Sequence, residues 1–294
     1  MNQRGIVVIA IRFRHGAGKS YTPSGVNRTS GGEGKVDLIF PGLIYPEQVS
    51  GLPWWPLAVV VIALVLINIV NNRVAPQTHY LMWAFAGSVL MLAIGLLDGN
   101  DFTDMGLGFA YLLPGLIWAV ASIVLITLVY FISSIFRKSR EAFADQRIGA
   151  MSGGRLAFQT LVEVPFGTVM LEEIAFRAVL FSMLARRFGV IPALIISSVI
   201  FGLWHILPSI GTHENNPALG SVVGTGRRGA VLAVIASVVT TSLAGILFVG
   251  MRILSGSVLA PMGFHWATNG LGYFFSWFLL RHRARRERRD FGGE

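Results

Sequence analysis

The segment Val164–Leu184, VPFGTVMLEEIAFRAVLFSML, decides how the rest of the chain is organised. It is apolar except for a few small polar residues and three charged ones, Glu172, Glu173 and Arg177. A buried charge costs several kcal/mol unless it is paired, hydrogen-bonded or neutralised. Glu173 and Arg177 are four residues apart, so on a helix they can form an ion pair. Glu172 points about 100° away from Glu173, and we therefore expect it to be available for chemistry.

The composition is that of a membrane protein. Of the 294 residues, 53% are hydrophobic and 13% are charged, whereas soluble domains average about 25% charged residues. The formal net charge is +9, and Lys and Arg lie mainly in tails and connections, as expected of charges that face anionic lipid headgroups. They are not interleaved with aromatic residues, so we expect no nucleic-acid partner. The absence of cysteine excludes disulfides, thiolate metal sites and a cysteine nucleophile.

Seven apolar segments approach or exceed the length of about 20 helical residues that crosses the hydrocarbon core of a bilayer. They are Trp54–Val70, Tyr80–Leu97, Tyr111–Phe136, Leu156–Met183, Ile191–Ile210, Ala230–Ile253 and Val258–Leu280. Pro114 stands near the start of the third segment and can break it, so the count ranges from six to eight. The sequence therefore predicts an all-α fold, a polytopic transmembrane helical bundle.

Two histidines stand in other predicted spans. His205 ends the stretch SSVIFGLWH, four residues after Phe201, and His265 begins the pattern HWATN that ends at Asn269. Residues four apart share one face of a helix, so Phe201 can flank His205, and His265 and Asn269 can point to one place. Polar groups within spans usually face the interior of the bundle and serve a function. We therefore expect these groups and Glu172 to share one site inside the bundle.

This set of groups suits the hydrolysis of an amide. A carboxylate assisted by an imidazole can take a proton from water, and a second imidazole with an amide N–H can stabilise the oxyanion. The alternative is a metal site, in which Glu172, His205 and His265 give an N2O ligand set with one open position. Asn269 favours the oxyanion role, because an amide is a poor zinc ligand. We expect no required cofactor, with zinc as the alternative.

Together the three patterns resemble the CPBP family of intramembrane proteases, which includes the type 2 CAAX prenyl endopeptidases and bacterial proteins linked to bacteriocin processing and self-immunity. Glu172, Glu173 and Arg177 match EExxxR, Phe201 and His205 match FxxxH, and His265 and Asn269 match HxxxN. The similarity covers roughly Leu156–Ser276. The family usually has Gly after the Arg of the first motif, where this chain has Ala178, which is still small enough for close helix packing.

The resemblance implies roles for these residues in a helical membrane fold whose site opens toward the cytoplasm. Glu172 would activate water together with His205, and His265 and Asn269 would form the oxyanion hole. Glu173 and Arg177 would support the site. The family is often labelled a metalloprotease, although a metal-free mechanism based on glutamate has been argued for it.

We divide the chain into a polar N-terminal tail (1–50) that we expect to be mobile, N-terminal transmembrane helices (51–150), a catalytic transmembrane core (151–280) and a basic cytoplasmic tail (281–294). Basic residues after the third span (Arg137, Lys138, Arg140 and Arg147) and after the last one place both connections in the cytoplasm. Arg186 and Arg187 fall on the opposite side of this scheme. We expect a multi-pass protein of a bacterial plasma membrane with a cytoplasmic C-terminus.

The expected function is that of an intramembrane endopeptidase acting at the cytoplasmic membrane face on a membrane-associated or prenylated, CAAX-like substrate. Its partners would be membrane lipids and a peptide or protein substrate. The alternative is a non-catalytic immunity or scaffold protein with the same fold. A transporter that uses the carboxylates as proton relays is a third hypothesis, but the sequence lacks the inverted repeats typical of that class.

Overall fold

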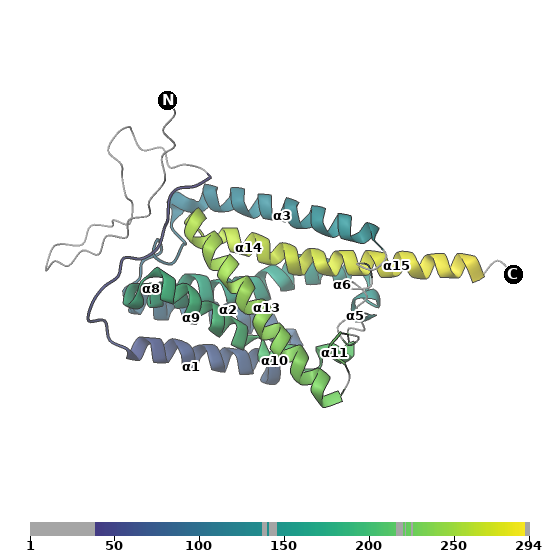
Figure 1. The fold of residues 1–294 in the computed structure, drawn as a ribbon, viewed down its shortest axis with the longest axis horizontal. Helices are drawn as coiled ribbons and strands as arrows, with labels where there is room; N and C mark the ends of the chain where they lie inside the picture. Colours follow the sequence, from purple (N-terminus) through teal and green to yellow (C-terminus); the bar gives the residue numbers. More distant parts are fainter. Residues whose placement is uncertain are drawn as a thin grey trace, which may run out of the picture.

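The computed structural model describes residues 39–136, 140, 146–215, 220, 222–224 and 226–291, and within them it contains helices and no strand. The predicted all-α polytopic bundle is confirmed (Figure 1). Five helices of the described residues are long and apolar enough to cross a membrane: Trp55–Val74, Tyr80–Leu97, Phe109–Ile135, Val190–Ser209 and Gly226–Ser255. The two other predicted spans are also helical, over residues 153–188 and 259–291. These two contain Glu172, Glu173, Arg177, His265 and Asn269, and they are less apolar than the other five.

The first three spans are simple apolar helices. α1 (Trp55–Ile69) continues into the π-helical segment η1 (Val70–Val74), and a short 3₁₀ segment, η2 (Gln77–His79), leads into α2 (Tyr80–Leu97). A second short 3₁₀ segment, η3 (Phe109–Tyr111), precedes α3 (Leu112–Ile135). Large apolar side chains are exposed along all three helices, which is expected of helices that face lipid.

The run from residue 153 to 188 forms the centre of the bundle. It consists of α6 (Gly153–Phe158), the π-helical segment η4 (Gln159–Val169), α7 (Met170–Glu173), the π-helical segment η5 (Ile174–Leu180) and α8 (Phe181–Phe188). Ser152 caps its start, because its hydroxyl accepts a hydrogen bond from the backbone N–H of Arg155. Every residue from 171 to 185 is buried. The charged segment is therefore enclosed by the other helices rather than facing lipid.

The remaining helices of the described residues pack on this run or on one another. They are α5 (Gln146–Gly149), α9 (Val190–Trp204), α10 (Ile206–Ser209), α11 (Thr212–Asn215), α13 (Gly226–Ser255), α14 (Leu259–Trp266), the π-helical segment η6 (Ala267–Leu271) and α15 (Gly272–Phe291). Figure 1 shows α13 crossing the bundle obliquely and α15 extending beyond it at the end where α5 and α11 lie. Small residues let α9 and α13 approach closely: a Cβ added to Gly202 would lie 2.6 Å from the carbonyl oxygen of Val238.

Part of the predicted N-terminal tail is held against helix ends. Residues 1–38 lie outside the described residues, but residues 39–50 make hydrogen bonds to three helices. The backbone N–H of Ile44 donates to the Ile253 carbonyl at 3.0 Å, and the Trp118 indole donates to the Ile39 carbonyl at 2.7 Å. The backbone N–H of Val49 donates to the Arg186 carbonyl at 2.7 Å. This segment therefore packs on α13, α3 and α8 at the end of the bundle away from α15.

Arg186 and Arg187, which contradict the predicted orientation, lie beside Asp98 at the end of α2. The Arg187 guanidinium contacts both carboxylate oxygens of Asp98, at 2.5 and 2.7 Å, and both side chains are almost fully buried. Arg186 donates to the Asp98 backbone carbonyl at 2.8 Å. Because the two arginines bind Asp98 instead of facing lipid headgroups, they say little about which side of the membrane this end of the bundle occupies. Arg137 and Lys138, which support the orientation, lie outside the described residues, and the predicted basic tail is helical up to Phe291.

Candidate active site

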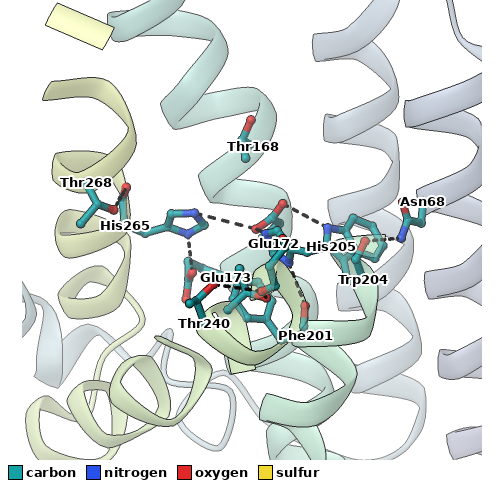
Figure 2. Close-up of polar contacts among 12 residues, drawn as sticks. Asn68, Thr168, Glu172, Glu173, Phe201, Trp204, His205, Thr240, His265 and Thr268 are labelled. Atoms are coloured by element: carbon teal, nitrogen blue, oxygen red, sulfur yellow. Dashed lines mark hydrogen bonds and ion pairs between the residues drawn. The ribbon is translucent and has the colours of Figure 1, made fainter. Parts of the chain in front are cut away.

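Glu172 and Glu173 occupy the middle of the central run, on the short helix α7 between two π-helical segments. Glu172 is 7% exposed and Glu173 is fully buried. Figure 2 shows Glu172 between two imidazole rings, those of His265 and His205, which reach it from different helices. His205 lies at the end of α9 and His265 lies in α14. The structure thus brings together three of the predicted site residues from three separate parts of the chain.

The three side chains meet at one carboxylate oxygen. Oε2 of Glu172 lies 3.9 Å from Nε2 of His205 and 3.8 Å from Nε2 of His265. This oxygen is buried and has no hydrogen-bond partner among the described residues. The two distances exceed those of direct hydrogen bonds, but an oxygen atom of water or substrate between the groups can bond to both sides.

Each imidazole is oriented by a hydrogen bond at its other nitrogen. Nδ1 of His205 lies 2.8 Å from the carbonyl oxygen of Phe201, which can only accept, so Nδ1 carries the proton. Nδ1 of His265 lies 2.7 Å from Oε1 of Glu173, which is likewise an acceptor when ionised. In the neutral form of both rings, the lone pair of Nε2 is therefore the group that faces Glu172.

Glu173 and Arg177 are paired as their spacing predicted. Nη1 of Arg177 lies 3.2 Å from Oε1 of Glu173, and both side chains are buried. The guanidinium also lies over two aromatic rings, 3.8 Å from the centroid of Phe201 and 4.7 Å from that of Phe248. Glu173 has a second role that the sequence did not indicate, because its Oε1 also accepts from His265. It therefore links the Arg177 cation to the orientation of an imidazole.

Aromatic residues complete the walls of the site. The Phe201 ring packs 4.7 Å from His205, as expected from the spacing of these residues. Phe248 of α13 packs 5.2 Å from His265. Sequence reasoning missed Phe248, because a phenylalanine in an apolar span carries no distinguishing signal. It also missed Trp204, whose indole Nε1 donates to Oε1 of Glu172 at 3.1 Å. A signal was present for Trp204, since a buried indole N–H usually needs an acceptor.

Asn269 lies one turn beyond His265, in η6, where it lines a cavity of about 430 Å³. Thr168, one turn before Glu172 on the central run, lines the same cavity. The other lining residues are Ile148, Gln159, Val164, Thr268, Gly272 and Tyr273. The backbone at Asn269 is π-helical, and its wider turn changes the angle between side chains four residues apart. Asn269 thus stands at the cavity wall, whereas His265 bonds to Glu173.

The positions of Glu172, His205 and His265 also bear on whether the site can bind a metal ion. Tetrahedral zinc with nitrogen and oxygen ligands at 2.0–2.1 Å places its donor atoms about 3.3 Å apart. The carboxylate oxygen of Glu172 is further than this from both histidine nitrogens, at 3.8 and 3.9 Å. Among the described residues, no group of three or more His, Cys, Asp or Glu side chains is arranged to hold a metal ion. To hold zinc, Glu172, His205 and His265 would therefore have to move closer together than they lie here.

Comparison with known proteins shows one family model that part of the chain matches. Residues 155–271 match the family model described as Rce1-like, type II CAAX prenyl endopeptidase. The match contains all seven residues of the three patterns and confirms the resemblance to the CAAX protease family. Neither the curated proteins nor the solved structures gave a match to the chain.

Proposed function

We propose that this protein hydrolyses a peptide bond of a membrane-associated or prenylated, CAAX-like substrate with water that Glu172 activates. Residues 155–271 match the Rce1-like model of type II CAAX prenyl endopeptidases, which supports the proposal. The observation that carries the proposal is the position of Oε2 of Glu172, which is buried and faces Nε2 of His205 and of His265 at 3.9 and 3.8 Å. A carboxylate held in this way can accept a proton from water bound beside it.

In the proposed reaction, the water oxygen attacks the carbonyl carbon of the scissile bond while its proton passes to Oε2 of Glu172. His205 is the more accessible of the two imidazoles, with 20% of its side chain exposed, and it is placed to hold the water. The tetrahedral oxyanion then re-forms the carbonyl, the C–N bond breaks, and the same proton passes from Glu172 to the departing amine nitrogen, which completes the hydrolysis.

The developing oxyanion needs donors on the other side of the carbonyl. His265 can donate from Nε2 when it is an imidazolium, and the carboxylate of Glu173 at Nδ1 neutralises the charge of that form. Asn269 offers amide N–H donors from the wall of the adjoining cavity. We assign the oxyanion hole to His265 and Asn269 for these reasons.

The cavity of about 430 Å³ is the proposed place for the substrate peptide. Its volume is within the range of about 300–1,000 Å³ found for ligand pockets. Gln159 and Asn269 give it side-chain amides that can bond to a peptide backbone. Two of its lining residues, Thr168 and Asn269, lie one helical turn from Glu172 and from His265, respectively.

Cleavage of a peptide library in lipid tests the proposal, with prenylated and unprenylated peptides in parallel and products identified by mass spectrometry. Glu172→Gln keeps the shape of the side chain and should lower kcat by about 10²- to 10⁴-fold, because the general base is lost. Glu163→Gln is the matched control on the same helical run, where Glu163 pairs with Arg155 at 2.8 Å, and should keep wild-type activity. Full activity of Glu172→Gln would refute the mechanism. An inactive wild-type chain that co-purifies with a partner would favour the immunity or scaffold function instead.

Metal dependence has a separate test. Because Glu172, His205 and His265 would have to move closer together to hold zinc, we propose that no metal is required. Activity should therefore survive exhaustive chelation. Loss of activity on chelation, with recovery on adding zinc, would overturn this part of the proposal.

We also propose that the protein lies in a bacterial plasma membrane with its C-terminus in the cytoplasm. The chain has no cysteine, so single cysteines introduced at exposed Leu97 and His282 can be labelled without background. A membrane-impermeant thiol reagent should reach Leu97→Cys in intact cells and His282→Cys only after the membrane is opened. The reverse pattern would overturn the orientation.

A further inference from the structure

One oxygen of the Glu172 carboxylate is held by a hydrogen bond, and the other oxygen faces the site. Oε1 accepts a hydrogen bond from the indole Nε1 of Trp204 at 3.1 Å, and both residues are 7% exposed. Oε2 faces the two histidines. The terminal torsion of a glutamate has no strong preference of its own, so a fixed donor at one oxygen sets the carboxylate plane and hence the direction in which the other oxygen faces the histidines.

Trp204 is itself fixed from a different helix. Its backbone carbonyl lies at the end of α9, where carbonyls lack partners within the helix, and accepts from Nδ2 of Asn68 at 2.8 Å. Asn68 belongs to α1 and is 8% exposed. Its own Oδ1 accepts from Nδ2 of Asn72 at 2.6 Å. Figure 2 shows Asn68 reaching Trp204 from the side opposite to Glu172.

Packing restricts the indole further. Phe176, one turn after Glu172 on the central run, lies edge-on to the Trp204 ring at 5.5 Å. Phe176 also packs on Phe201 at 5.1 Å. The indole N–H therefore has little freedom to turn away from Glu172. Burying an asparagine in an apolar span is costly unless it is bonded, so the contact between Asn68 and Trp204 compensates for that cost.

From these contacts we infer that Trp204 is a positioning residue for Glu172, and that Asn68 of α1 acts on the site through Trp204. This inference rests on the proposed function, because it assigns a task in the proposed hydrolysis to two residues outside the three motifs. It also gives α1, which contributes no group to the chemistry, a direct part in aligning the base. Loss of the indole N–H should impair the chemical step more than substrate binding.

Steady-state kinetics of Trp204→Phe test the inference. The variant keeps an aromatic ring and loses the N–H, and a hydrogen bond to a charged group of this kind corresponds to about a 10- to 100-fold change in rate. We expect kcat to fall by that factor while KM stays within about twofold, the signature of an interaction that acts in the transition state. Trp118→Phe is the matched control, because its indole donates to Ile39 at the far end of the bundle. It should keep wild-type kcat.

A wild-type kcat in Trp204→Phe, or a raised KM with unchanged kcat, would overturn the inference while leaving the proposed function intact. An inactive wild-type chain would remove the proposed function and this inference together. If Trp204→Phe does not fold, β-(3-benzothienyl)alanine at position 204 replaces only the N–H by sulfur and should show the same loss of kcat. An unchanged kcat in that variant would also refute the role of the hydrogen bond.

The second arm addresses Asn68. Asn68→Leu, which is close to isosteric, should lower kcat in the wild-type background and have a smaller effect when Trp204 is already Phe, because residues that act in series are not additive. Fully additive losses in kcat would show that Asn68 acts independently of the indole. If Asn68→Leu lowers the yield of folded protein but leaves kcat unchanged, Asn68 has a structural role only.

Discussion

Glu173 and Arg177 form a buried ion pair. We expect the two residues to differ in how far their substitution lowers the free energy of unfolding. Glu173→Gln preserves shape and removes the negative charge, so the guanidinium, which is 1% exposed, loses the carboxylate at 3.2 Å. Breaking a buried pair from one side costs about 3–5 kcal/mol. The rings of Phe201 and Phe248 contact Arg177 before and after the change, so their attraction does not enter the difference.

The opposite substitution should cost less. Arg177→Met leaves Glu173 with a second partner, since its Oε1 still accepts from His265 at 2.7 Å. Replacing both members by neutral residues removes the uncompensated charge altogether, which is often neutral for stability. We therefore expect the free energy of unfolding to fall most in Glu173→Gln, less in Arg177→Met, and by about 2 kcal/mol or less in the double variant.

Unfolding of the purified protein in bicelles, measured by steric trapping, gives these free energies. Glu163→Gln removes a carboxylate from a partly exposed pair and should cost less than about 1 kcal/mol. A loss below about 1 kcal/mol for Glu173→Gln, or a double variant no more stable than Glu173→Gln, would refute the reasoning from the buried charge.

Two further predictions concern the packing of the bundle. Gly202→Ala should destabilise the protein by about 1–3 kcal/mol, because the new methyl group meets the side chain of Ser242 and the carbonyl oxygen of Val238. Thermal unfolding in detergent measures this, and an unchanged midpoint would contradict the close contact of α9 and α13. Asp98→Asn should cost about 3–5 kcal/mol, since it leaves the buried Arg187 guanidinium without a counter-charge, although that group still donates to the Pro53 and Met183 carbonyls. Adding Arg187→Met should restore most of that loss, and no recovery in the same assay would argue against the pair.

The spans could be predicted from the sequence because the bilayer requires a minimum length of apolar residues. The prediction for Tyr80–Leu97 agrees with α2 at both ends. The convergence of Glu172, His205 and His265 was also predictable, since ionisable groups within spans avoid lipid and face the bundle interior. Both the positions of the spans and the inward placement of their polar groups follow from local composition and from the apolar bilayer around the protein.

Contacts that depend on how helices are rotated against one another were not predictable. The hydrogen bond from Trp204 to Glu172 requires a particular rotation of α9 against the central run, which the apolar pattern of either helix does not specify. The packing of residues 39–50 was missed for a related reason. Their composition is typical of a tail, but Ile44 is buried through hydrogen bonds with α13 that arise only in the folded chain.

The π-helical turns on both sides of Glu172 and Glu173 have a consequence for insertions and deletions. A π-helical turn contains one residue more than an α-helical turn, so deleting a residue from η4 or η5 can be absorbed by conversion to α-helix. α9 is α-helical throughout and has no extra residue to lose. Each residue deleted from it rotates the residues that follow by about 100° about the helix axis. Length variation should therefore be tolerated in the segments beside the two glutamates and should abolish function in the helix that carries His205.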